Sequence, residues 1–292
     1  MKRACLLVAA VLLTPLAHAD ERIERRAPAD PDGEVTVLNV AGKLRIEGWD
    51  RAEVEVTGTL GRGVERLEFT TDGNRTEIRV ELPKGNDRGG SADLEIRIPA
   101  ASSLSTNTVS ADQTIENVRG LQRLQAVSGD VATESWAEEI EIRTVSGDVR
   151  LQGHGEPALA SVTTVSGDAR LDDVAGEVAI NTVTGDFEVD SGVLTRGRMR
   201  TTNGDLDLTA TLAPDGRLDI ETINGDLTVD FEGPLGAEFD IETFNGDIDN
   251  CFGPDPVRTS KFAPGRELRF REGDGKARVR IKSLNGGIRF CR

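Results

Sequence analysis

A six-residue pattern of the type TVSGDV, found at residues 144–149, recurs along this chain, and its spacing constrains the fold more than any other feature. Seven copies contain a Gly-Asp pair, with glycines 18 to 21 residues apart: Gly129, Gly147, Gly167, Gly185, Gly204, Gly225 and Gly246. Weaker copies place Ala111, Gly42 and Gly286 in the glycine position. Repeats of this length are typical of folds in which small equivalent units stack on one another.

Residues on either side of each glycine alternate between apolar and polar. The positions two and four after the glycine are mostly apolar, as in Val149 and Leu151, and so is the position five before it, as in Ile142. This period of two is typical of strands with one buried face. Each unit therefore predicts two short strands joined by a corner. We interpret the valine after the Gly-Asp pair, as in Val149, as core, the glycine as the corner, and the serine and aspartate as holding the turn. Four phenylalanines that fall in apolar columns are also expected in the core: Phe187, Phe239, Phe244 and Phe290.

The repeats predict an all-β fold. We expect a β-solenoid of 18–21-residue rungs over residues 101–292, preceded by an irregular β-rich part at 20–100 that is continuous with the repeats and caps them. The near-constant spacing and the in-phase apolar columns favour this arrangement. The alternative is a β-sandwich built from repeated hairpins, in which each Gly-Asp pair would be a tight hairpin turn.

Stacking would bring the aspartates that follow the motif glycines into one line, about 4.8 Å apart. Like charges facing each other across strands are destabilising, so backbone N–H groups, water or calcium must relieve them. One Gly-Asp per repeat, without paired glycines, favours turn aspartates. We therefore expect no metal or other cofactor, with a cation contact along the aspartate column, calcium above all, as the alternative. The aspartates are Asp112, Asp130, Asp148, Asp168, Asp186, Asp205, Asp226 and Asp247.

Two cysteines occupy the same column of the repeat. Cys251 and Cys291 each lie five residues after a motif glycine. Neighbouring rungs would hold their Cα atoms about 4.8 Å apart, within the range of about 4.4–6.8 Å that a disulfide requires. We predict a structural Cys251–Cys291 disulfide, the alternative being two free thiols. Residues 252–277, which contain three prolines, are then an excursion from the stack.

Residues 1–19 have the pattern of a secretory signal peptide. A basic start is followed by an apolar run of about ten residues and by small residues up to Ala19, after which we expect cleavage. The protein is therefore predicted to be periplasmic or secreted. The remaining chain contains no apolar stretch near the roughly 20 residues of a membrane span, so no transmembrane segment is expected.

Composition narrows the classes of function. Without its leader the chain has 33 basic and 51 acidic residues, a formal net charge of −18, which disfavours nucleic acid as a partner. His154 is the only histidine left, and its setting between two glycines is typical of a surface loop. No nucleophile triad, metal cluster or nucleotide loop is present in the sequence, so we expect no catalytic residue and no enzyme.

The repeated units resemble the DUF4097 family, β-strand-repeat proteins labelled putative adhesins. The likeness extends from about Val35 to Arg292. It includes the opening segment NVAGKLRIEGWDRAEVEV, the strand LEIRIPA and the closing unit GKARVRIKSLNGGIRF. The turn aspartate is missing at Lys43 and Gly287, both of which we place in end units. The resemblance implies an exported cell-envelope β-repeat protein and carries over no catalytic or binding residue.

Three hypotheses for the function follow. The first is a non-catalytic, adhesin-like scaffold or binding surface whose partner is an envelope component or a surface polymer. The second is a glycan-acting enzyme on a β-solenoid, which would need a groove with clustered acids and an exposed tryptophan such as Trp49 or Trp136. The third is a calcium-stabilised surface module, which would need cations along the aspartate column.

Overall fold

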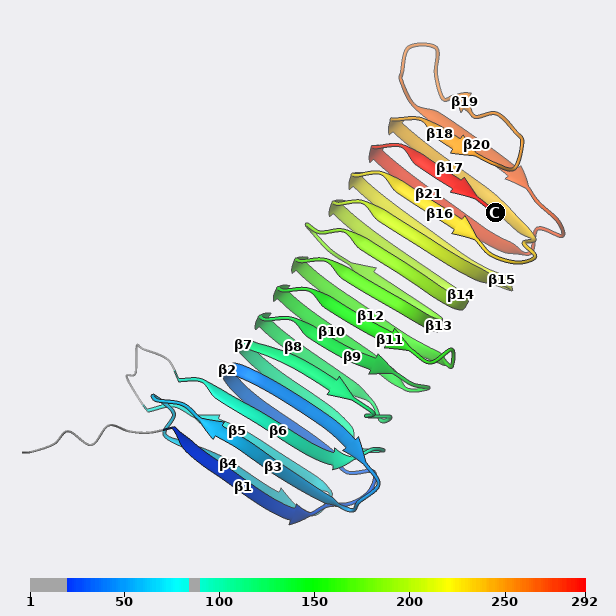
Figure 1. Ribbon diagram of the computed structural model, residues 1–292. Helices are drawn as coiled ribbons and strands as arrows, with labels where there is room; N and C mark the ends of the chain where they lie inside the picture. The colour runs from blue at the N-terminus through cyan, green and yellow to red at the C-terminus, as the bar shows by residue number, and fades with distance from the viewer. Residues whose placement is uncertain (1–19, 84–89) are drawn as a thin grey trace, which may run out of the picture.

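The computed structural model describes residues 20–83 and 90–292 (Figure 1). The signal peptide predicted at 1–19 lies outside the described residues. Within them the chain forms 22 strands and no helix, which confirms the all-β prediction. A helix long and apolar enough to span a membrane is consequently not found in the described part of the chain.

The middle of the chain is a stack of parallel strands (Figure 1). In one wall β8 pairs with β10 and β10 with β12, while in another wall β9 pairs with β11 and β11 with β13. The strands of this region are β7 (Ser103–Glu116), β8 (Gln122–Ser128), β9 (Val131–Ser135), β10 (Glu139–Ser146), β11 (Val149–Gly153), β12 (Pro157–Ser166), β13 (Ala169–Asn181), β14 (Phe187–Asn203), β15 (Leu206–Asn224) and β16 (Leu227–Phe231).

The register of the stack places equivalent residues of successive repeats side by side. Ile142 pairs with Leu124 on one side and with Val162 on the other, and all three are buried. Strands on either side of a Gly-Asp corner pair with neighbouring repeats: β10 pairs with β8 and β12, and β11 with β9 and β13. The corner is therefore not a hairpin turn. The apolar columns form one core that extends along the stack.

The N-terminal strands cover one end of this stack. β2 contains Gly42 and pairs in parallel with β7 on one side and with β5 and β6 on the other. Outside these, β4 pairs with β5, β3 with β6 and β1 with β3, all antiparallel. The open edge of the parallel stack is thus covered, as expected. The strands are β1 (Glu21–Pro28), β2 (Glu34–Trp49), β3 (Glu53–Leu60), β4 (Arg66–Asp72), β5 (Arg75–Glu81) and β6 (Ala92–Pro99).

At the other end, the order of the repeats in space differs from their order in the chain. β21 pairs in parallel with both β15 and β17, and β22 with both β16 and β18. The last repeat of the sequence therefore lies between the two repeats that precede it (Figure 1). The strands are β17 (Ala237–Asn245), β18 (Ile248–Asn250), β19 (Val257–Arg258), β20 (Arg266–Arg271), β21 (Ala277–Asn285) and β22 (Ile288–Cys291).

This insertion corrects one expectation. The repeat that contains Gly287 is not an end unit, because the rung of Gly246 lies beyond it. The unit that contains Lys43 is not an end unit either, because β2 lies between β6 and β7. The predicted excursion at 252–277 leaves the parallel stack and contains β20, which returns to pair antiparallel with β17. Phenylalanines gather where β20 covers the core: Phe239 stacks on Phe270 with ring centroids 4.6 Å apart, and Phe290 lies 5.6 Å from Phe239.

Candidate functional site

In six of the seven Gly-Asp corners, all but that of Gly246, the glycine is required for two reasons. Gly147 has a φ of 142°, a conformation that residues with a side chain rarely adopt. A Cβ atom at Gly147 would also lie 2.2 Å from the carbonyl oxygen of Gly129 in the rung below. The same approach recurs from rung to rung, so the glycines allow the corners to stack closely.

The aspartates after these glycines are hydrogen-bonded from one rung to the next. The backbone N–H of Asp148 donates to Oδ1 of Asp130 at 3.0 Å, and the N–H of Asp168 donates to Oδ1 of Asp148 at 3.1 Å. We call this series the aspartate ladder. Its acceptors, with donor–acceptor distances between 2.7 and 3.2 Å, are Asp112, Asp130, Asp148, Asp168, Asp186, Asp205 and Asp226.

The eighth predicted member, Asp247, does not join the ladder in the same way. Asp226 accepts its bond from the backbone N–H of Gly287, and Gly287 has no carboxylate to offer to the next rung. Asp247 lies in that next rung and instead forms an ion pair with Arg266 at 2.8 Å. The inserted repeat therefore interrupts the ladder.

Sequence reasoning missed one aspartate of this kind. Asp93 in β6 accepts a hydrogen bond from the backbone N–H of Lys43 at 3.0 Å, and the two residues occupy the turn position of adjacent rungs. The signal was present in the sequence, because Ala92-Asp93 precedes an alternating Leu-x-Ile segment as Gly-Asp does elsewhere. The substitution of alanine for glycine concealed it.

The ladder carboxylates already have a structural role. Each Oδ1 that accepts a backbone N–H is partly neutralised by that donor, which relieves the repulsion expected along a line of acids. Among residues 20–83 and 90–292, no group of three or more His, Cys, Asp or Glu side chains is arranged to hold a metal ion. The geometry favours turn aspartates, and the calcium alternative remains a prediction for experiment.

The column of Val145 corrects one core assignment, because Phe244, which we expected in the core, occupies this column and is 48% exposed. Val145 is about half exposed, whereas Thr144 beside it is buried. The strand continues without a break to Ser146, so the alternation that places Ile142 inside also places Thr144 inside and Val145 outside. Several of the buried hydroxyls have no hydrogen-bond partner among residues 20–83 and 90–292: Thr144, Thr164, Thr201, Thr222 and Ser283.

The exposed side chains at the valine position form an apolar line on the corner edge, which we call the apolar strip. Rung spacing of about 4.8 Å makes it about 38 Å long from Val109 to Phe244. It runs beside the aspartate ladder and has a single polar member, Thr202. The apolar members, each 44–49% exposed, are in spatial order Val109, Val127, Val145, Val165, Val183, Ile223, Leu284 and Phe244.

The structure contains the disulfide between Cys251 and Cys291, with Cα atoms 4.9 Å apart. Cys291 follows Phe290, which pairs with Asn250 across β18 and β22. The two cysteines are brought together because the last repeat lies directly against the one that precedes it in the chain. The bond joins β22 to the start of the 252–277 excursion.

The tryptophans that could have formed a sugar platform are partly covered by other side chains. Trp136 stacks on His154 with ring centroids 3.9 Å apart, and the Arg119 guanidinium lies 4.9 Å from the Trp136 ring. Trp49 donates from Nε1 to the carbonyl oxygen of Glu53 at 2.9 Å. Trp49 is the last residue of β2 and Trp136 directly follows β9, so both lie at strand ends.

A stack of parallel two-stranded repeats joined at Gly-Asp corners defines a class of repetitive all-β protein. The chain belongs to the Toastrack DUF4097 family, whose pattern matches residues 53–289. This confirms the resemblance seen in the sequence.

Three solved structures are similar to the chain. A putative adhesin from Bacteroides fragilis has 12% identity and a TM-score of 0.43, and the match covers 92% of this chain and 97% of that one. A putative cell adhesion protein from Clostridium sporogenes has 9% identity, a TM-score of 0.24 and coverage of 93% and 99%. A putative adhesin from Parabacteroides merdae has 11% identity, a TM-score of 0.26 and coverage of 73% and 95%. No curated protein matches the sequence.

Proposed function

We propose that this protein is an exported, non-catalytic binding scaffold of the cell envelope, adhesin-like in its action and built as a β-solenoid rod. The observation behind this proposal is the apolar strip. Soluble monomeric proteins rarely expose long contiguous apolar surface without a binding role. Here the exposure is repeated at the same position of nearly every rung, with valine in five rungs in succession.

The strip has the properties of a contact surface for an extended partner. It is about 38 Å long, and it consists mostly of β-branched side chains, which have few rotamers to lose on binding. The adjacent acids keep the edge soluble while it is unoccupied. An envelope component or a surface polymer is the class of partner that fits, because the acidic chain repels nucleic acid.

Export is the second part of the proposal. The leader at 1–19, cleaved after Ala19, would direct the chain to the periplasm or the medium. The Cys251–Cys291 disulfide supports this, since structural disulfides persist in oxidising compartments. A mass spectrum of the exported chain should correspond to a protein that begins at Asp20.

The function is tested by sedimenting the chain that begins at Asp20 with washed envelopes of the cells that export it. The variant V145S/V165S removes two adjacent apolar side chains of the strip and leaves the core intact. The matched control L159S/V193S removes two equally exposed apolar side chains that lie elsewhere.

We expect the wild type and the control to sediment with the envelopes and V145S/V165S to lose most of its binding. If the wild type does not sediment, or if both variants lose binding equally, the proposal is wrong. Since the two strip positions are half exposed, circular dichroism should show the same melting curve for all three proteins.

A further inference from the structure

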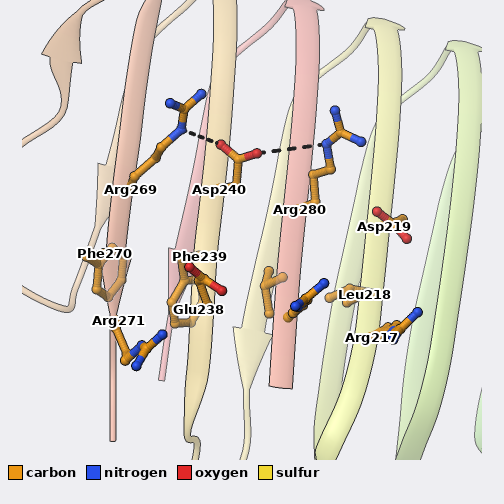
Figure 2. A pocket seen from close by; sticks show the side chains of 12 residues that line it. Arg217, Leu218, Asp219, Glu238, Phe239, Asp240, Arg269, Phe270, Arg271 and Arg280 are labelled. Atoms are coloured by element: carbon orange, nitrogen blue, oxygen red, sulfur yellow. Dashed lines mark hydrogen bonds and ion pairs between the residues drawn. The ribbon is translucent and has the colours of Figure 1, made fainter. Parts of the chain in front are cut away.

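One wall of the C-terminal half has outward side chains in rows that run along the stack. The register of β14, β15, β21, β17 and β20 places one residue of each strand in each row. Figure 2 shows part of this wall, with the side chains around a hollow of about 730 Å³. The order of positive and negative charges distinguishes one of the rows from the other two.

In two rows opposite charges alternate from β14 to β17, as is usual for neighbouring strands. In the first, Asp240 lies between Arg269, whose Nε donates to it at 2.8 Å, and Arg280 at 3.9 Å (Figure 2). The members of that row are Arg198, Asp219, Arg280, Asp240 and Arg269.

The second alternating row lies next to it. Nζ of Lys282 donates to Glu242 at 2.6 Å, and this bond holds the pKa of Glu242 below its usual value. Arg200 pairs with Glu221 at 3.2 Å in the same row. Glu267 of β20 ends this row next to Glu242, and Arg269 of the first row contacts both carboxylates, at 3.6 and 2.8 Å. The two rows therefore compensate each other.

The remaining row breaks the rule, and we call it the arginine row. Arg196, Arg217 and Arg278 are direct neighbours in register, so three like charges follow one another about 4.8 Å apart. Glu238 comes next, and Arg271 lies beyond it. Like charges directly opposite each other destabilise a sheet.

The arginine row also lacks compensation from its surroundings. Arg196 pairs with Glu177 at 3.4 Å, but the part of the chain that the structure describes offers no ion-pair partner within 4.0 Å to Arg217, Arg271 or Arg278. All four arginines are exposed. The protein has a formal net charge of −16, whereas these three guanidinium groups, which have no ion-pair partner among the described residues, surround one hollow. The local charge is therefore opposite in sign to the charge of the whole protein.

We propose that the arginine row binds a linear anionic polysaccharide laid along the stack. Guanidinium groups bind carboxylate, phosphate and sulfate through paired hydrogen bonds, and the row offers several of them in line. From Arg196 to Arg271 the row spans about 19 Å. A thin chain can follow it, whereas a flat anionic membrane would meet the acidic remainder of the surface.

This site is separate from the apolar strip, and it adds a ligand class to the proposed function without depending on it. The strip variant V145S/V165S leaves every residue of the arginine row unchanged. A failure of envelope binding and a failure of polysaccharide binding are therefore distinguished by which variant changes which measurement.

The test is titration calorimetry of the chain that begins at Asp20 with four probes. Polygalacturonate and dextran sulfate are the anionic polysaccharides, neutral dextran is the uncharged control, and phosphatidylglycerol vesicles represent an anionic membrane. We expect the wild type to bind both anionic polymers and neither of the other probes. Raising the salt concentration should weaken binding, because the contacts are ionic.

Three variants locate the site. R217Q/R278Q should weaken binding by about tenfold or more, because two charge-assisted contacts are lost. R45Q/R170Q removes the same total charge at two arginines on other strands and should change the dissociation constant less than about twofold. E238Q removes the acid within the row and should tighten binding about twofold to tenfold.

Three results would overturn the proposal. They are no binding of either polymer by the wild type, equal weakening in both double variants, and binding to the vesicles alone. Arg217 and Arg278 have no ion-pair partner to lose within the described part of the chain, so R217Q/R278Q should melt at or slightly above the wild-type temperature. A lower melting temperature together with normal polymer binding would also contradict the account.

Discussion

Oδ1 of Asp226 accepts a hydrogen bond from the backbone N–H of Gly287 at 2.7 Å, across 61 residues of sequence. This bond marks the place where the last repeat enters the stack between two earlier ones. The parallel neighbour of the rung of Gly246 is therefore the last repeat, which follows the excursion at 252–277 in the chain. At the C-terminal end of the stack the last two repeats are exchanged in spatial order, and the antiparallel strand β20 covers β17 of the outer repeat.

Replacement of a ladder aspartate tests the role of its side chain as an acceptor. Asp186 accepts the N–H of Asp205 at 2.8 Å. D186A should lower the free energy of unfolding by about 1 kcal/mol, because the donor in the corner loses its partner. D186N keeps an acceptor oxygen and removes a charge, so it should stay within about 0.5 kcal/mol of the wild type. Urea unfolding measures both, and equal losses would contradict the role of the oxygen.

A methyl group at a corner glycine should be far more damaging than one at an open glycine. Gly185 has a φ of 141°, and its Cβ would lie 2.1 Å from the carbonyl oxygen of Gly167. We expect G185A to cost about 3 kcal/mol or more. Gly233 has a φ of 75° with nothing within 4 Å, so G233A should cost only about 1–2 kcal/mol. Similar midpoints in urea for the two variants would show that close stacking of the corners is not the cause.

Removal of the disulfide should loosen the C-terminal rungs first. The bond closes a loop with a sequence separation of 40, and the chain-entropy relation gives about 4 kcal/mol for a loop of that size. In C251S/C291S, hydrogen exchange should accelerate in β17, β18, β21 and β22 before it does in β10. A thiol titration of the native chain that begins at Asp20 should find no free thiol. Two free thiols would contradict the pairing.

Calcium should leave the stability unchanged. Each ladder carboxylate from Asp112 to Asp226 already accepts a backbone N–H, and a single file of such groups leaves most of a calcium coordination shell to water. Melting curves recorded with calcium and with chelator should coincide. A rise in the midpoint with calcium, reversed by the chelator and reduced in D186N, would instead support the calcium-stabilised module.

The sequence was sufficient to predict the strands and the cysteine pairing, because both depend on local columns. Ile142, Val149 and Leu151 are buried as their alternation predicted. The apolar columns in the sequence would be the same for either stacking order of the last two repeats, however. They could not predict which of these two repeats lies outermost. That order depends on contacts such as Asp226 to Gly287, which leave no periodic signal in the chain.

The corner was misread although the necessary signal was present. We assigned Phe244 to the core, but it occupies the column of Val145, which lies three positions after Ile142 and therefore on the opposite face. Following the alternation through to Ser146 would have placed Thr144 inside and Val145 outside, and would have predicted the apolar strip. The arginine row could not have been foreseen, since Arg217 and Arg278 become neighbours only through the exchanged order.

Site-specific photocrosslinking tests the central claim most directly, which is that the exposed corner edge is the binding surface. A photoreactive phenylalanine analogue is placed at Val165 in the apolar strip or at Arg150, an exposed position outside the strip. After illumination on washed envelopes, the account predicts a crosslinked envelope product from position 165 and none from position 150. Crosslinking from position 150 alone, or from neither position while the protein still sediments with envelopes, would contradict it.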